Sequence, residues 1–301
     1  MAFINDLSGV IPPLATPLTE DYKVDEANLR KLTRFVMDAG ASALFVMGST
    51  GEFPIFTRRE RKSIIETVVD EVGGRIPVLA GISDSATRLA VRNATDAEEA
   101  GADAVVLTMP YYFRASGDQD ALDHYRFIAN STRLPLIIYN VPQAVKSIVS
   151  VDVVVQLAEE GTAVAIKDSS TDFTSFTSLV LRLKHLPNFR IFQGSEFQMA
   201  ASVFIGAHGG VLGIANVIPH LCVKLYEAAS QGRVEESREL QRKVTAVSQV
   251  FWAGESPLGG LKTAISMLGF GGPTVSIPIQ PLSPKSQDGI RRILVDEGIL
   301  P

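Results

Sequence analysis

The chain contains 301 residues, of which 46% are hydrophobic and 20% are charged, a globular composition far from that of disordered proteins. At about 150 residues per domain, this length fits two ordinary domains or one large barrel. The 28 basic and 33 acidic residues leave a net charge of -5, which argues against binding to a nucleic-acid backbone.

Eight short apolar runs are predicted as β-strands. Several are apolar on both faces, for example Val105–Leu107 and Leu136–Ile138, which is typical of parallel strands covered on both sides. Their first residues lie 20 to 34 positions apart, the length of one strand–helix unit. In chain order, the predicted strands are Val10–Leu18, Ala43–Gly48, Pro77–Ile82, Ala104–Pro110, Pro135–Pro142, Val164–Ser170, Arg190–Ser195 and Gly210–Asn216.

The longer segments between these runs are predicted as amphipathic helices. Residues Val24–Gly40 carry an apolar stripe at helical spacing and end on glycine. Thr57, followed three positions later by Glu60, is a capping-box signature at the start of Thr57–Gly74. Two more of these helices, which also end on glycine, are predicted over Ala86–Gly101 and Val151–Gly161.

This strict alternation predicts a (β/α)8 barrel over residues 1–233. An open doubly wound sheet is the alternative, but Val10–Pro13 lacks the glycine-rich dinucleotide fingerprint. Beyond residue 233 only helices are predicted, and we expect residues 234–301 to form a helical appendage that packs on the barrel. Its predicted segments are Val234–Ala253, Pro257–Phe270 and Lys285–Leu300, with a Gly/Pro-rich loop over Gly271–Pro284.

Cysteine usage and the N-terminal residues bear on the cellular compartment. Cys222 is the only cysteine, so no internal disulfide and no cysteine zinc site can form. Residues Met1–Val10 have neither the basic start nor the apolar run of a signal peptide. No apolar run approaches the roughly 18 residues of a membrane span. We therefore expect a cytoplasmic protein with no membrane partner.

Lys167 is the most informative residue at the carboxyl ends of the strands, where barrels carry their active sites. Of ten lysines it alone directly follows a buried run, Val164–Ile166. Burial removes hydration from an ammonium group and favours the neutral amine, the nucleophile that forms a Schiff base with a carbonyl substrate. The alternative is a structural ion pair between Lys167 and Asp168 or Glu196.

Other polar side chains fall at neighbouring strand ends. Tyr139 can pass a proton to and from a substrate, although a buried tyrosine can equally be a core residue that donates one hydrogen bond. Ser49 and Thr50 lie in Gly48–Glu52, whose glycines either let backbone N–H groups approach an anion or simply form a tight turn.

Glu196 and the pair Tyr111 and Tyr112 remain ambiguous at this point. Glu196 is either a polar substrate contact or the start of the next helix, and the two tyrosines are either site residues or interface packing. We expect no metal centre, because the four histidines are poorly placed as ligands and His208 is predicted to be structural. The histidines are His124, His185, His208 and His220.

Three motifs occur together, Gly48–Glu52 (GSTGE), Tyr139–Pro142 (YNVP) and Ile166–Asp168 (IKD). In order and spacing they match the family of dihydrodipicolinate synthase and N-acetylneuraminate lyase, which are class I, pyruvate-dependent aldolases. The resemblance extends from Gly9 through the helical tail. It implies a (β/α)8 barrel, a homotetramer built from dimers, a pyruvate-type 2-oxo acid substrate, and catalysis without a metal or other cofactor.

The resemblance also assigns catalytic roles. It implies that Lys167 forms the imine with pyruvate and that Tyr139 is the proton shuttle. Ser49 and Thr50 would bind the pyruvate carboxylate, with Thr50 completing the proton relay. Tyr112 corresponds to a tyrosine that reaches the active site of a neighbouring subunit.

The substrate is predicted from two expected contacts with its tail and from one difference from the synthase sequences. Gly194 and Glu196 fall where the lyases of this family contact the hydroxylated tail of their substrate. The synthases carry a carboxylate-binding arginine five residues after the shuttle tyrosine, where this chain has Ala144. Alanine cannot make a bidentate carboxylate contact. Lys146 either compensates for the missing arginine or is a solvent-facing loop lysine. Together with Asp168–Ser170, this favours a lyase that cleaves a 2-oxo-3-deoxy sugar acid to pyruvate and an aldehyde.

Several alternatives remain open at this point. Within the family they are a synthase that condenses pyruvate with aspartate semialdehyde and a dehydratase that uses the same imine. Outside it, the alternatives are a metal-dependent barrel enzyme and a barrel that has lost catalysis and serves as a binding or regulatory protein.

Overall fold

The computed structural model describes residues 2–113 and 116–301. Within them, eight parallel strands form one sheet in the order β1-β8-β7-β6-β5-β4-β3-β2. Nearly every strand residue is buried, as expected for parallel strands covered by helices. The strands are β1 (Gly9–Val10), β2 (Leu44–Val46), β3 (Val78–Gly81), β4 (Ala104–Leu107), β5 (Leu136–Asn140), β6 (Ala165–Asp168), β7 (Arg190–Gln193) and β8 (Gly209–Gly210).

Backbone hydrogen bonds between the segments of β1 and β2 close the sheet into a barrel. The Ser42 N–H donates to Val10 O at 2.9 Å, and the Phe45 N–H donates to Pro12 O at 3.0 Å. On the other edge, β1 pairs with β8. The predicted (β/α)8 barrel is therefore confirmed.

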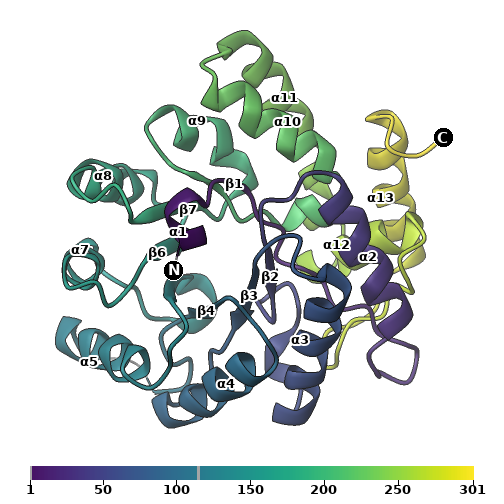
Figure 1. The fold of residues 1–301 in the computed structure, drawn as a ribbon. Helices are drawn as coiled ribbons and strands as arrows, with labels where there is room; N and C mark the ends of the chain where they lie inside the picture. The colour runs from purple at the N-terminus through teal and green to yellow at the C-terminus, as the bar shows by residue number, and fades with distance from the viewer. Residues whose placement is uncertain (1, 114–115) are drawn as a thin grey trace.

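A helix follows each strand, and Figure 1 shows these helices arranged in a ring around the strands. The short helix α1 (Ala2–Asp6) lies at the amino-terminal ends of the strands, where Arg190 Nε donates to Ile4 O at 3.2 Å. The ring consists of α2 (Glu26–Asp38), α3 (Arg58–Val72), α4 (Thr87–Glu99), α5 (Asp118–Ala129), α7 (Val151–Glu159), α8 (Phe173–Leu183), α9 (Met199–Phe204) and α10 (Pro219–Ser230). Shorter turns are η1 (Phe53–Ile55), α6 (Pro142–Val145), η2 (Glu196–Gln198) and η3 (Gly213–Asn216).

The ends of α3 follow from its sequence. Thr57 Oγ1 accepts from the Glu60 N–H, and Glu60 Oε2 accepts from the Thr57 N–H at 2.8 Å, so the predicted capping box is present. The helix ends at Gly73, whose φ of 57° lies in the left-handed region that glycine adopts without strain.

All eight strands are shorter than predicted, and the first and the last lose most of their expected length. The first stops after Val10, because Pro12 and Pro13 have no N–H to donate to a ladder. The predicted strand Gly210–Asn216 is wrong beyond Gly210, since Gly213–Asn216 forms the turn η3. There the Asn216 side chain replaces strand pairing: its Oδ1 accepts from the Ala15 N–H at 3.0 Å, and its Nδ2 donates to Pro13 O at 2.9 Å.

The C-terminal tail is helical and packs against the barrel. It contains α11 (Val234–Val247), η4 (Ser248–Phe251), α12 (Pro257–Met267) and α13 (Pro284–Asp296). Phe270, just after α12, packs on Phe35 of α2 with ring centroids 4.7 Å apart. Helix α13 packs against α12. The packing of the tail on the barrel is as expected, whereas a domain boundary between residues 233 and 234 stays a prediction.

Candidate active site

Strands β5 and β6 place Lys167 beside Tyr139. The two residues are direct partners in the parallel register, and each is only 5% exposed. Lys167 Nζ lies 4.1 Å from the centroid of the Tyr139 ring and 5.1 Å from that of Phe45. The Tyr139 and Phe45 rings meet edge to face at 5.9 Å. The lysine and tyrosine predicted from separate motifs are therefore in contact, and two aromatic rings shape the space around the amine.

The carboxylate of Asp168 points to partners other than Lys167. Its Oδ2 accepts from Asn140 Nδ2 at 3.0 Å, and its Oδ1 accepts from the Ser170 N–H at 2.8 Å and the Ser170 hydroxyl at 2.6 Å. A salt bridge between Asp168 and Lys167 is not found in the described part of the chain. This fixed carboxylate instead ties the ends of β5 and β6 together.

Glu196 lies in η2, buried at the wall of the same cavity. Its Oε1 accepts from the Ile214 N–H at 3.1 Å, and its backbone oxygen accepts from Gln241 Nε2 at 2.8 Å. Burial raises the pKa of the Glu196 carboxyl, while its backbone donors and the positive charge of Lys167 oppose that rise. Glu196 thus begins a helical turn and also lines the cavity, and its contact with a substrate stays a prediction.

A cavity of about 280 Å³ opens over Lys167 at the carboxyl ends of the strands. Five of the predicted residues line it, namely Thr50, Tyr139, Lys167, Gly194 and Glu196. The other lining residues are Pro13, Ser169, Thr171, Ser195, Phe197, Val211, Gly213, Phe251, Trp252 and Pro257.

Phe251, Trp252 and Pro257 belong to the tail, and sequence reasoning missed them. Trp252 is the only tryptophan of the chain and follows η4 directly. An aromatic side chain at the end of a predicted helix was the one available signal. It does not reveal which part of the barrel the helix end faces.

Ser49 and Thr50 face different spaces. Thr50 lines the Lys167 cavity, whereas Ser49 is exposed and lines a neighbouring, largely apolar cavity of about 420 Å³. Tyr111 and Ala144 line this second cavity too. Tyr112 lies on the surface, 74% exposed, with its ring against that of Phe113 at 5.0 Å. Within this chain, the structure thus brings Thr50 to Lys167 but not Ser49 or Tyr112.

Gly194 lies where a larger residue has no room. A Cβ at this position would stand 2.0 Å from Ser169 Oγ and 2.8 Å from the Asp168 backbone oxygen. The Gly194 N–H also donates to Asp168 O at 2.7 Å. The glycine therefore allows the β6 and β7 ends to approach each other beside Lys167, in addition to lining the cavity.

The structure places the histidines in supporting positions. His208 Nδ1 accepts from the Ile191 N–H at 3.0 Å, and burial lowers its pKa to about 4, which agrees with the structural role predicted for it. Burial likewise lowers the pKa of His124 to about 4. Among residues 2–113 and 116–301, no group of three or more His, Cys, Asp or Glu side chains is placed to hold a metal ion. None of the described helices has the length and apolar composition needed to cross a membrane.

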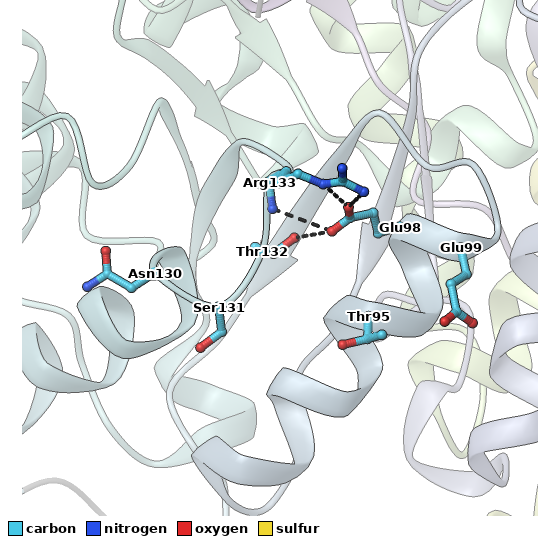
Figure 2. A pocket seen from close by; sticks show the side chains of 7 residues that line it. All are labelled: Thr95, Glu98, Glu99, Asn130, Ser131, Thr132 and Arg133. Atoms are coloured by element: carbon cyan, nitrogen blue, oxygen red, sulfur yellow. Dashed lines mark hydrogen bonds and ion pairs between the residues drawn. The ribbon is translucent and has the colours of Figure 1, made fainter.

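Figure 2 shows a separate polar depression, lined by Thr95, Glu98, Glu99, Asn130, Ser131, Thr132 and Arg133. Its walls come from the end of α4 and the loop before β5, where Glu98 accepts from Thr132 Oγ1 at 3.2 Å and forms an ion pair with Arg133. Because this loop precedes a strand, the depression is far from the strand ends that carry chemistry in barrels. We therefore take the cavity at Lys167 as the candidate active site.

The sequence model of the dihydrodipicolinate synthetase family matches residues 6–297. The chain belongs to this family. An uncharacterised DapA-like lyase of Halobacterium salinarum is 34% identical over 294 residues, covering 98% of this chain and 95% of that protein. A 4-hydroxy-tetrahydrodipicolinate synthase of Gluconacetobacter diazotrophicus is 31% identical and covers 97% of each chain. The family resemblance expected from the three motifs is thus confirmed.

Solved structures of the family share the whole fold. YagE, a prophage protein of the family from Escherichia coli K12 solved in complex with pyruvate, superposes with a TM-score of 0.93 at 26% identity, covering 98% of this chain and 99% of that chain. Dihydrodipicolinate synthase of Bacteroides thetaiotaomicron gives a TM-score of 0.92 at 38% identity, covering 96% and 98%. The chain is accordingly a lyase of the pyruvate-dependent aldolase type.

Proposed function

We propose that this enzyme reversibly cleaves a 2-oxo-3-deoxy sugar acid to pyruvate and an aldehyde, through an imine on Lys167. The observation that carries the proposal is the contact of 4.1 Å between Lys167 Nζ and the Tyr139 ring in a cavity at the strand ends. Asp168, the carboxylate next to Lys167 in the chain, is held by Asn140 and Ser170. The amine is therefore available to a substrate rather than tied in an ion pair with Asp168.

The chemistry follows from the electron demand of an imine. The Lys167 amine adds to the C2 carbonyl, and loss of water from the carbinolamine gives a protonated imine. Its C=N bond accepts the electron pair of the C3–C4 bond as that bond breaks. The C4 hydroxyl loses its proton, and the fragment that begins at C4 leaves as an aldehyde, while C2 and C3 become part of an enamine. Protonation of C3 and addition of water to the imine then release pyruvate and regenerate the amine.

Protons must move at the carbinolamine and at the C4 oxygen, and Tyr139 is proposed to carry them. Its ring already stands against Lys167 Nζ, so its phenol lies near the site of reaction. Thr50, on the same cavity wall, is proposed to bind the substrate carboxylate and to continue the relay. Ser49 is proposed to bind the substrate carboxylate from the edge of the site. Tyr112 is proposed to reach the active site of a second subunit in a homotetramer.

The tail of the substrate is proposed to lie against Gly194 and Glu196. Ala144 occupies the position of the synthase arginine. It is exposed and lines the neighbouring cavity, the one that Ser49 also lines. Lys146 is not aimed at the site to compensate: its ammonium donates to the backbone oxygen of Gln143 at 2.6 Å. These two positions favour a lyase over a synthase.

Synthase activity is the second candidate, because several relatives of about one-third identity are 4-hydroxy-tetrahydrodipicolinate synthases. Initial rates should be compared for cleavage of 2-keto-3-deoxygluconate and of N-acetylneuraminate. The same comparison should include dehydration of 2-keto-3-deoxygluconate and condensation of pyruvate with aspartate semialdehyde. Robust condensation would overturn the inference from Ala144. Activity lost on treatment with a chelator would instead favour a metal-dependent barrel enzyme.

Trapping of the imine tests the central claim. The protein is incubated with pyruvate and borohydride, and the added mass is located by peptide mapping. We expect the adduct on Lys167, its loss in Lys167→Ala, and its retention in the control Lys146→Ala. No adduct, or an adduct on another lysine, would refute the mechanism and leave the catalytically inactive barrel as the better interpretation. The cytoplasmic location and the homotetramer stay predictions, the latter checked by light scattering.

A further inference from the structure

A buried ion pair joins the C-terminal tail to the turn that carries Thr50. Lys262 Nζ of α12 lies 2.6 Å from Glu52 Oε1, and both side chains are only 2% exposed. The two residues are 210 positions apart in the chain. Burying two charges costs much of their hydration, and a hydrophobic pair of similar volume is often at least as stable. Stability alone is therefore a poor explanation for this pair.

The pair lies at the centre of a network that meets on the turn Gly48–Glu52. Lys262 Nζ also donates to the backbone oxygen of Thr16 at 2.9 Å, and the Ser276 N–H donates to Glu52 Oε2 at 2.8 Å. The Thr16 hydroxyl in turn donates to Gly51 O at 2.9 Å. Two segments of the tail and the segment after β1 thus hold the last two residues of the turn.

The turn has an unusual backbone conformation, which this network of hydrogen bonds holds in place. Glu52 has φ 56° and ψ 35°, and Met47, just before the turn, has φ 59°. Residues other than glycine adopt this left-handed region rarely, and only where surrounding contacts hold them in it. Ser49 and Thr50 lie between these two residues. The side chain of Thr50 therefore faces the Lys167 cavity only while the turn keeps this unusual shape.

We propose that Glu52 and Lys262 are positioning residues for the carboxylate end of the 2-oxo acid substrate. By clamping the turn, they keep Thr50 toward the Lys167 cavity and Ser49 toward the neighbouring one. This inference rests on the proposed function, in which Thr50 binds the substrate carboxylate. A loosened turn weakens pyruvate binding but leaves the amine of Lys167 and its contact with Tyr139 in place.

The test is a pyruvate titration of borohydride trapping in E52Q, K262M and the double variant E52Q/K262M. The double variant leaves no unpaired buried charge, and E52Q alone keeps the shape of the side chain and a carbonyl oxygen as acceptor. We expect the pyruvate concentration for half-maximal trapping to rise roughly tenfold to a hundredfold. At saturating pyruvate, the adduct should still form on Lys167. The matched control is Ile290→Ala, which opens a cavity in the buried side of α13 without touching the turn.

The outcomes separate the two proposals. If the wild type gives no adduct on Lys167, the proposed function fails first. If the wild type is trapped but any folded variant of the three keeps the wild-type half-saturation, the positioning role is overturned. An equal rise in Ile290→Ala would also overturn it, because general loosening of the tail would then explain the effect. Circular dichroism and thermal melting establish which variants are folded.

Discussion

Replacing Tyr139 with phenylalanine separates a proton shuttle from a core residue. The ring contacts of Tyr139 with Phe45 at 5.9 Å and with Lys167 Nζ at 4.1 Å do not involve the phenol oxygen, so phenylalanine preserves them. No hydrogen bond joins that oxygen to another side chain or backbone group in residues 2–113 and 116–301. The free energy of unfolding should therefore change by no more than about 0.5 kcal/mol. Loss of a positioned acid–base group should lower kcat for cleavage roughly 100- to 10,000-fold.

Tyr125 provides the matched control for this substitution. It is completely buried in α5, and its hydroxyl donates to Leu107 O at 3.3 Å, so Tyr125→Phe removes a hydrogen bond inside the protein. We expect it to cost about 1 kcal/mol of stability while leaving kcat unchanged. Urea unfolding and a coupled assay of pyruvate release measure the two quantities in each variant. Wild-type kcat in Tyr139→Phe would refute the shuttle and leave Tyr139 as a core residue.

Three further predictions follow from packing and burial. Gly194→Ala should lose about 1–3 kcal/mol of stability together with activity, because its Cβ would overlap Ser169 and the Asp168 backbone; lost activity at unchanged stability would instead indicate a pure substrate contact. Burial lowers the pKa of His124 from 6.5 to about 4, so the unfolded chain binds this proton first and stability falls by about 3 kcal/mol as the pH drops from about 6.5 to 4. In His124→Gln, urea unfolding at pH 6.5 and pH 4 should show a smaller loss of stability between the two pH values than in the wild type. A loss equal to that of the wild type would show that His124 is not its cause. Burial raises the pKa of the Cys222 thiol, so a thiol reagent should modify this cysteine only after denaturation.

Local patterns were sufficient for the alternation of strands and helices and for the proposed catalytic pair. The capping box at Thr57 and Glu60 depends on residues three positions apart, and the periodicity of each element is equally local. Lys167 and Tyr139 could be paired in advance because each ends an apolar run, and barrels collect strand ends at one face. The ends of strands could not be predicted where a proline interrupts the hydrogen bonds between strands, as at Pro12, or where a side-chain amide makes them instead, as at Asn216.

Tertiary structure decided which residues complete the site. Trp252 reaches the Lys167 cavity from the tail, and Ser49 turns away from it although Thr50 next to it does not. Glu52 finds its counter-charge at Lys262, 210 residues along the chain. A local pattern shows that a charge lies near an apolar run, but not which distant charge will meet it in the interior. The lysine and its tyrosine could therefore be identified from sequence, whereas the walls of the cavity and the clamp on its turn required the packed tail.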